Sequence, residues 1–90
     1  MEIEDWRIRI DEINDELIAL LNRRAQYATE IGKLKKAKGL PVFDASRENA
    51  VLARVGELAE KAQKDGGPLT PESIKNIFQA IMVETRKVEE

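Results

Sequence analysis

The chain contains no cysteine and no histidine. Without cysteine it can form neither a disulfide framework nor a thiolate metal site. Without histidine it lacks the commonest general base and the commonest metal ligand. The composition therefore excludes most familiar catalytic arrangements, and we expect no bound metal ion.

Glycine and proline are also scarce, with five and three residues among 90. Charged residues make up 36% of the chain and hydrophobic residues 42%, a balance typical of long amphipathic helices. The net charge of -2 provides no broad attraction to nucleic acid or to an anionic membrane. No apolar run approaches the ~20 residues of a membrane span, and the N-terminus lacks a signal-peptide pattern. We expect one cytoplasmic domain over residues 1–90.

The first predicted helix runs from about Ile3 to Lys38, where apolar residues recur at alternating spacings of three and four. Gly39 and Pro41 end it, because glycine suits a left-handed cap and proline cannot continue a helix. At 1.5 Å per residue this helix would be roughly 50 Å long, more than a domain of this size is wide. It must pack on something beyond its own chain, and we predict a homodimer.

Two shorter helices follow, and no segment has the pattern of a strand. Asp44 is a candidate N-cap for a helix that ends near Lys64, and Thr70 followed by Pro71 is a strong start signal for the next. The fold class is therefore all-α, with one very long helix and two shorter ones. The third helix is expected to direct six side chains inward: Ile74, Ile77, Phe78, Ile81, Met82 and Val88.

Arg24 occupies a position in the apolar seam of the first helix, between Leu17 and Ile31. Burying an unpaired cation is costly, so Arg24 needs an anionic partner. In one interpretation, Arg24 is a polar seam residue that sets the register of the helices and pairs with a glutamate of a neighbouring helix. The other is a binding site for an anionic ligand.

Two more cations bear on this choice. Lys35 follows Arg24 by three turns, so both point to nearly the same side at an axial separation of ~16 Å and can converge on one small ligand. Arg7 lies about 25 Å from Arg24 along the axis, too far to hold the same molecule within one chain. If two long helices pair antiparallel, Arg7 of one chain lies beside Arg24 of the other, and the sites are shared.

The remaining polar candidates lie at the start of the second helix and near the end of the third: Asp44, Arg47, Glu48, Thr85 and Glu89. With the cations, they suit a small polyanion that carries hydroxyl or ether oxygens. Each also has a simpler interpretation. Arg7 and Arg47 resemble ordinary surface residues, Lys35 a solvated helix end and Glu89 a frayed terminal residue.

Taken together, these residues resemble the all-helical class of chorismate mutases. Four segments carry the resemblance: R-I-R-I-D-E-I-N-D-E-L-I-A-L-L-N-R-R from Arg7 to Arg24, E-I-G-K-L-K from Glu30 to Lys35, P-V-F-D-A-S-R-E from Pro41 to Glu48, and I-F-Q-A-I-M from Ile77 to Met82. The combination of I-G-K-x-K with D-x-x-R-E is the most specific part. The resemblance implies an intertwined helical homodimer with two sites, which converts chorismate to prephenate.

The resemblance also implies roles for the cations. Arg24 would bind one substrate carboxylate, and Arg7 of the partner subunit would bind the other, with Arg47 in support. Lys35 would donate to the ether oxygen whose bond breaks. This Claisen rearrangement needs no nucleophile, base, metal or cofactor, which agrees with the composition.

The other site residues have implied roles as well. Glu48 and the backbone at Asp44 would hold the ring hydroxyl, and Thr85 would replace the usual serine near a carboxylate. Glu89 stands where many members carry a glutamine that contacts the ether oxygen. Because only a protonated carboxyl can donate there, we expect activity to rise as the pH falls below neutrality.

Two alternatives stay open at this point. One is isochorismate pyruvate-lyase, which has the same general fold, and the other is a non-catalytic helical dimerisation or regulatory module. The segment G-G-P-L-T-P-E-S-I-K also resembles mutase modules fused to the first enzyme of the shikimate pathway. Two arrangements stay open: a chain that acts alone, and a module fused to, or associated with, another enzyme of that pathway.

Overall fold

The computed structural model describes all 90 residues and contains three helices and no strand. They are α1 (Ile3–Lys38), α2 (Ala45–Lys64) and α3 (Pro71–Glu89). The all-α prediction, with one long and two shorter helices, is confirmed. None of the three is both long enough and apolar enough to cross a membrane.

The predicted helix ends are also confirmed. Gly39 caps α1 in the left-handed conformation, with φ of 68°. The Asp44 side chain accepts a hydrogen bond of 3.0 Å from the backbone N–H of Arg47 at the start of α2. Thr70 caps α3 in the same way, because its hydroxyl oxygen accepts from the backbone N–H of Ser73 at 3.1 Å. Each cap satisfies a backbone group that the helix itself leaves without a partner.

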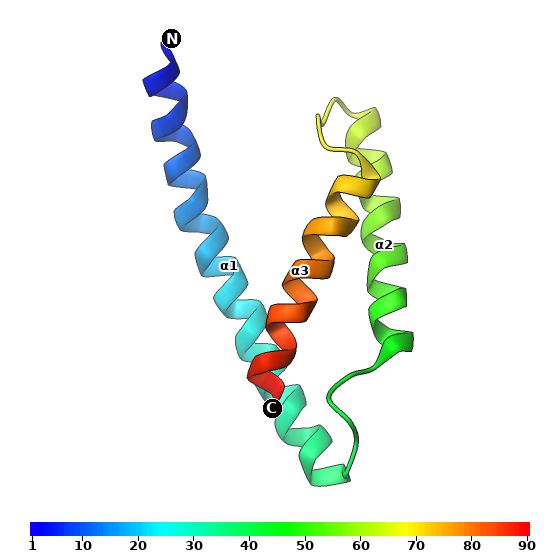
Figure 1. Ribbon diagram of the computed structural model, residues 1–90. Helices are drawn as coiled ribbons and strands as arrows, with labels where there is room; N and C mark the ends of the chain where they lie inside the picture. Colours follow the sequence, from blue (N-terminus) through cyan, green and yellow to red (C-terminus); the bar gives the residue numbers. More distant parts are fainter.

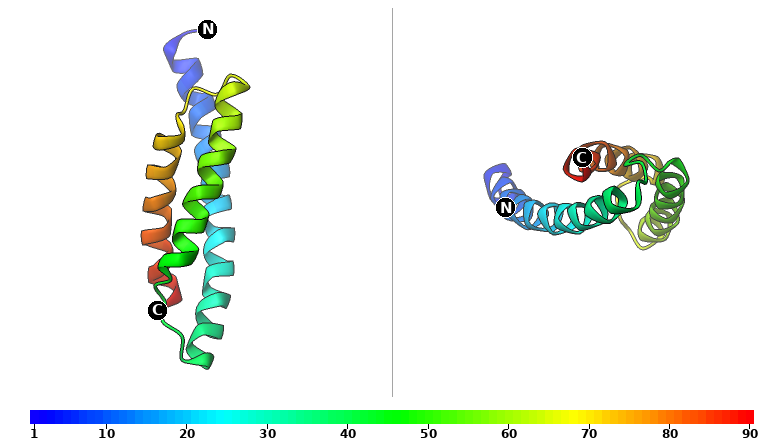
Figure 2. Two further views of the ribbon diagram at one scale, coloured as in Figure 1. Left: turned by 90° about the vertical axis from the view of Figure 1, so that its right-hand side faces the viewer. Right: turned by 90° about the horizontal axis from the view of Figure 1, so that it is seen from below.

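Helices α2 and α3 form an antiparallel pair, and α3 also packs against the C-terminal part of α1 (Figures 1 and 2). No Cα atom of α2 lies within 8 Å of a Cα atom of α1. Helices α1 and α3 lie close together at Gly32, where an added Cβ atom would lie 2.6 Å from the carbonyl oxygen of Glu89. Glycine is needed there because no side chain would fit between the two backbones.

The N-terminal half of α1 projects away from the other two helices (Figure 1). The molecule is accordingly elongated, with dimensions of 54 × 26 × 15 Å, and only five of its 90 residues are buried. The apolar seam of α1 is exposed to between 49% and 69% at nine positions: Ile3, Trp6, Ile10, Ile13, Leu17, Leu20, Tyr27, Ile31 and Leu34. A single chain therefore has almost no core of its own.

The prediction that α3 directs six side chains inward is only partly correct. Met82 is buried, with 5% exposure, but Ile77 and Val88 are 47% and 43% exposed. Helix α3 packs on α2 along one face and on α1 only near its own C-terminal end, so Ile77 has only α2 to pack on. Val88 lies in the turn that meets α1, but its side chain stays largely exposed. The apolar stripe of α3 thus extends beyond the residues that a single chain can cover.

Candidate active site

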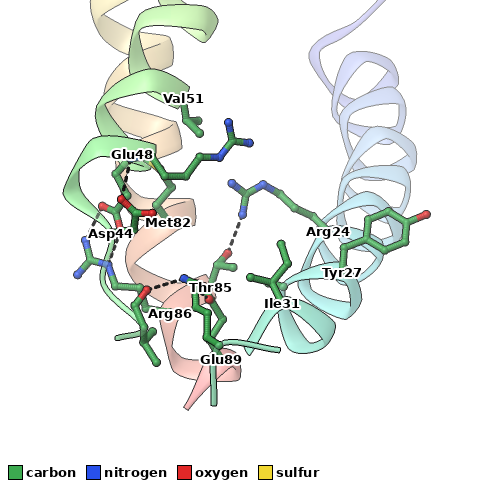
Figure 3. Close-up of a pocket in the computed structure, with 14 residues that line it drawn as sticks. Arg24, Tyr27, Ile31, Asp44, Glu48, Val51, Met82, Thr85, Arg86 and Glu89 are labelled. Atoms are coloured by element: carbon green, nitrogen blue, oxygen red, sulfur yellow. Dashed lines mark hydrogen bonds and ion pairs between the residues drawn. The ribbon is translucent and has the colours of Figure 1, made fainter. Parts of the chain in front are cut away.

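A cavity of about 430 Å³ lies where the C-terminal half of α1, the loop before α2, the first turns of α2 and the last turns of α3 converge (Figure 3). This size suits a small molecule. Helical periodicity explains how its walls are built. Helix α1 contributes residues spaced by three and four, which share one face: Arg24, Tyr27, Ala28, Ile31 and Lys35. Helix α3 contributes a second such set: Met82, Thr85, Arg86 and Glu89.

Seven of the eight site residues predicted from the sequence line this cavity: Arg24, Lys35, Asp44, Arg47, Glu48, Thr85 and Glu89. Arg7 does not, because it lies exposed on the projecting half of α1. This placement agrees with the axial separation of Arg7 and Arg24 expected from helix geometry.

Arg24 is half-buried, and its Nη1 donates a hydrogen bond of 2.9 Å to the Thr85 hydroxyl oxygen. The hydroxyl in turn donates to the carbonyl oxygen of Ile81 at 2.6 Å. No carboxylate of the chain lies within ion-pair distance of Arg24. Within one chain, the expected anionic partner is therefore replaced by a neutral hydroxyl, and several guanidinium N–H groups stay available to a ligand.

The ammonium group of Lys35 is held by two acceptors. It donates to the carbonyl oxygen of Val42 at 2.7 Å and to Oε1 of Glu89 at 2.8 Å. The Lys35 and Glu89 side chains are only 19% and 12% exposed. Lys35 is thus no solvated helix end, and Glu89 is no frayed terminus. An ammonium group has three N–H donors, so one is left for a ligand.

Glu48 forms a two-pronged ion pair with Arg86, which the sequence analysis missed. Nε and Nη2 of Arg86 donate to the two carboxylate oxygens at 2.7 and 2.8 Å. These hydrogen bonds lower the pKa of Glu48 from its ordinary value of 4.5, against the opposing effect of burial. The same hydrogen bonds raise the pKa of Arg86. Helical spacing was the available signal, since Arg86 lies four residues after the buried Met82 and shares its face.

The remaining charges around the cavity decide what it can bind. Lys35 and Arg86 are paired with carboxylates, and Asp44 caps α2. Arg24 and Arg47 have no carboxylate partner. Guanidinium groups without an internal counter-ion are suited to carboxylate or phosphate oxygens. The chain has no cluster of three or more acidic side chains that could hold a metal ion.

Comparison with known proteins agrees with this arrangement. The structure superposes on a chorismate mutase (Form II) from Thermus thermophilus with a TM-score of 0.82 and 31% identity, covering 97% of this chain and 92% of that one. A bifunctional chorismate mutase/prephenate dehydratase from Neisseria gonorrhoeae is 41% identical over 83 residues, which are 92% of this chain and 21% of that protein. An intracellular chorismate mutase from Mycobacterium tuberculosis is 40% identical over 57 residues, 63% of this chain and 54% of that protein.

The chain thus spans about a fifth of the length of the bifunctional relatives, 21% for the Neisseria protein and 22% for the one from Aquifex aeolicus. The family model for chorismate mutase type II matches residues 6–90, which include nearly all of the three helices and every residue that lines the cavity. The chain belongs to the chorismate mutase type II family.

Proposed function

We propose that this chain catalyses the Claisen rearrangement of chorismate to prephenate. One observation carries the proposal: Arg24, without a carboxylate partner, and Lys35, with one uncommitted N–H donor, face the same cavity. Chorismate has two carboxylates and an ether oxygen, so its chemistry complements these groups. The family match over residues 6–90 supports the same assignment.

The proposed mechanism uses binding and electrostatics alone. Arg24 and Arg47 hold one carboxylate and so keep the flexible enolpyruvyl group over the ring, which converts a rare conformation into the bound one. Lys35, whose position is fixed by Val42 and Glu89, donates to the ether oxygen as negative charge builds there during bond cleavage. No group of the protein has to gain or lose a proton for the rearrangement itself.

The remaining residues orient the substrate. Glu48 and the backbone at Asp44 hold the ring hydroxyl. Thr85 supports Arg24 through their hydrogen bond of 2.9 Å and contributes its hydroxyl near the carboxylate. Glu89 lies beside the ether oxygen and holds Lys35 through their hydrogen bond of 2.8 Å.

We also propose that the functional unit is a homodimer with two shared sites, in which Arg7 of the partner subunit binds the second carboxylate. The exposed seam of α1 supports this assembly, because it leaves a long apolar helix face without a partner. A cytoplasmic location is supported by the relatives named intracellular chorismate mutase. The bifunctional relatives support fusion to, or association with, another enzyme of the same pathway.

The decisive experiment incubates the protein separately with chorismate and with isochorismate. We expect prephenate from chorismate and no release of pyruvate from either substrate. Pyruvate from isochorismate alone would support the lyase instead. A protein that transforms neither compound, and whose melting temperature chorismate does not raise, would be a dimerisation or regulatory module, because a ligand that binds the folded state must stabilise it.

A further inference from the structure

We propose that Arg86 is a positioning residue, which holds the Glu48 carboxylate in one orientation so that its remaining lone pairs face the ring hydroxyl of chorismate. This inference rests on the proposed function and extends it to a residue outside the predicted site. Three kinds of observation carry it: the geometry of the ion pair, the support of Arg86 itself, and the charges around Glu48.

The geometry leaves Glu48 able to bind a ligand. Arg86 engages both carboxylate oxygens, at 2.7 and 2.8 Å, and reaches them from the side opposite to Arg24 (Figure 3). A carboxylate can accept about four hydrogen bonds, so two acceptor positions are left on a side chain that also lines the cavity. The planar fork of arginine fits this two-pronged contact, whereas the ammonium group of lysine does not.

Arg86 is itself held in place. Its guanidinium carbon lies 4.7 Å from the centre of the Phe43 ring, a cation–π contact with the loop before α2. The side chain is 33% exposed, and that of Glu48 20%. Arg86 thus joins α3 to the loop and to the first turn of α2, where Glu48 lies 38 residues earlier in the chain.

The ion pair with Arg86 also affects the ionisation of Glu48. Three charged groups act on Glu48: Arg86 on α3 and Lys35 on α1 lower the pKa of Glu48, while Asp44 beside it raises that pKa. The same cavity is lined by Arg24, Arg47 and Glu89. Because the hydrogen bonds from Arg86 are the largest of these effects, Glu48 stays ionised in mildly acidic solution. Arg86 thereby keeps Glu48 able to accept the ring hydroxyl over a wider range of pH.

The test compares steady-state kinetics on chorismate for the wild type, Arg86→Met, Arg86→Lys and a control, Lys87→Met. The control removes a positive charge one residue further along α3, from an exposed pair with Glu84. We expect Arg86→Met to raise KM roughly tenfold, the contribution of one charge-assisted hydrogen bond, with a smaller change in kcat. As the pH is lowered, the kcat/KM of Arg86→Met should also begin to decline at a higher pH than that of the wild type. Arg86→Lys should retain the acid-side profile but raise KM, and the control should match the wild type.

A double variant separates positioning from simple structural support. If Arg86 acts through Glu48, then adding Arg86→Met to Glu48→Gln should change KM by less than about twofold, because the two residues work as one unit. Full additivity, or an Arg86→Met variant with the KM and pH profile of the wild type, would overturn the inference. If Arg86→Met loses its helical circular dichroism, the test rests on Arg86→Lys, which keeps the charge. A raised KM for Arg86→Lys would support the inference, and a wild-type KM would overturn it. A wild type that forms no prephenate would refute the proposed function instead.

Discussion

Lys35 and Glu89 lie 54 residues apart in the chain, yet their side chains meet at 2.8 Å between Nζ and Oε1. The pair joins the end of α1 to the last turn of α3. Close packing permits this contact, because Gly32 lets the Glu89 backbone approach α1 without a side chain in between. The C-terminal turn is therefore part of the cavity wall.

The first prediction concerns the hydrogen bonds that the side chain at position 89 can make. A carboxylate near the ether oxygen cannot donate a hydrogen bond and opposes the negative charge that develops there, whereas an amide can donate. Glu89→Gln should therefore raise kcat/KM near neutral pH, which steady-state kinetics on chorismate will measure. A glutamine variant that is slower than the wild type would disprove the role.

The second prediction concerns assembly. We expect light scattering at micromolar concentration to give twice the 10.2 kDa mass of one chain, because the exposed seam of α1 needs a partner and the single chain has almost no core. Dilution should unfold the protein as it dissociates. A folded monomer would exclude the shared site.

The third prediction tests whether that site is shared. Arg7→Ala and Arg24→Ala should each nearly abolish activity while the protein keeps its helicity, because each removes a carboxylate ligand from both sites of the dimer. The Arg24 substitution should leave stability unchanged or raise it, since it removes a half-buried charge that has no carboxylate partner.

Mixed dimers of these two variants make the test specific. One of the two sites in such a dimer contains neither substitution, so unfolding and refolding the inactive proteins together should restore activity. Each variant refolded alone is the control. Heterodimers that form but stay inactive would contradict the assignment of Arg7 to the site of the partner subunit.

The fourth prediction compares two glycines in helices. In Gly32→Ala the new Cβ atom would lie 2.6 Å from the Glu89 carbonyl oxygen, so the end of α3 must move. We expect a loss of about 1–3 kcal/mol in stability, as for other overpacked contacts, together with a loss of activity. Gly56→Ala is the matched control, because its Cβ would meet only the flexible end of Lys75. Equal melting temperatures and rates for the two variants would show that the close approach at Gly32 is not needed.

The fifth prediction links the Glu48–Arg86 pair to acid stability. Folding lowers the pKa of Glu48 below 4.5, chiefly through the hydrogen bonds from Arg86, so folding favours the ionised form. The resulting stabilisation is complete above pH 4.5 and is lost as the pH falls through the lower value of the folded state. The melting temperature of Arg86→Met should therefore lie below that of the wild type at neutral pH, and the difference should shrink in strongly acidic solution. A difference independent of pH would contradict this linkage.

Much of the architecture follows from local sequence. The spacing of apolar residues and the caps at Gly39, Asp44 and Thr70 predicted the three helices, because periodicity and capping depend on residues within one or two turns. The same helix geometry placed Arg24 and Lys35 on one face and separated both from Arg7. The roles of most site residues came from resemblance to a family, not from spacing.

Contacts between distant segments depend on how the three helices pack. Local spacing put Arg86 on the same face of α3 as Met82. Its contacts with Glu48 and Phe43, however, depend on how α3 packs beside α2. Two other contacts depend on the approach of α3 to α1 at Gly32. Arg24 donates to the Thr85 hydroxyl in place of the expected carboxylate, and Lys35 donates to Glu89. Which helices form and which of their faces are polar could thus be predicted from the sequence, since those are properties of single helices. Which side chains meet was settled by packing, because a pair of charges can form only where two backbones are brought together.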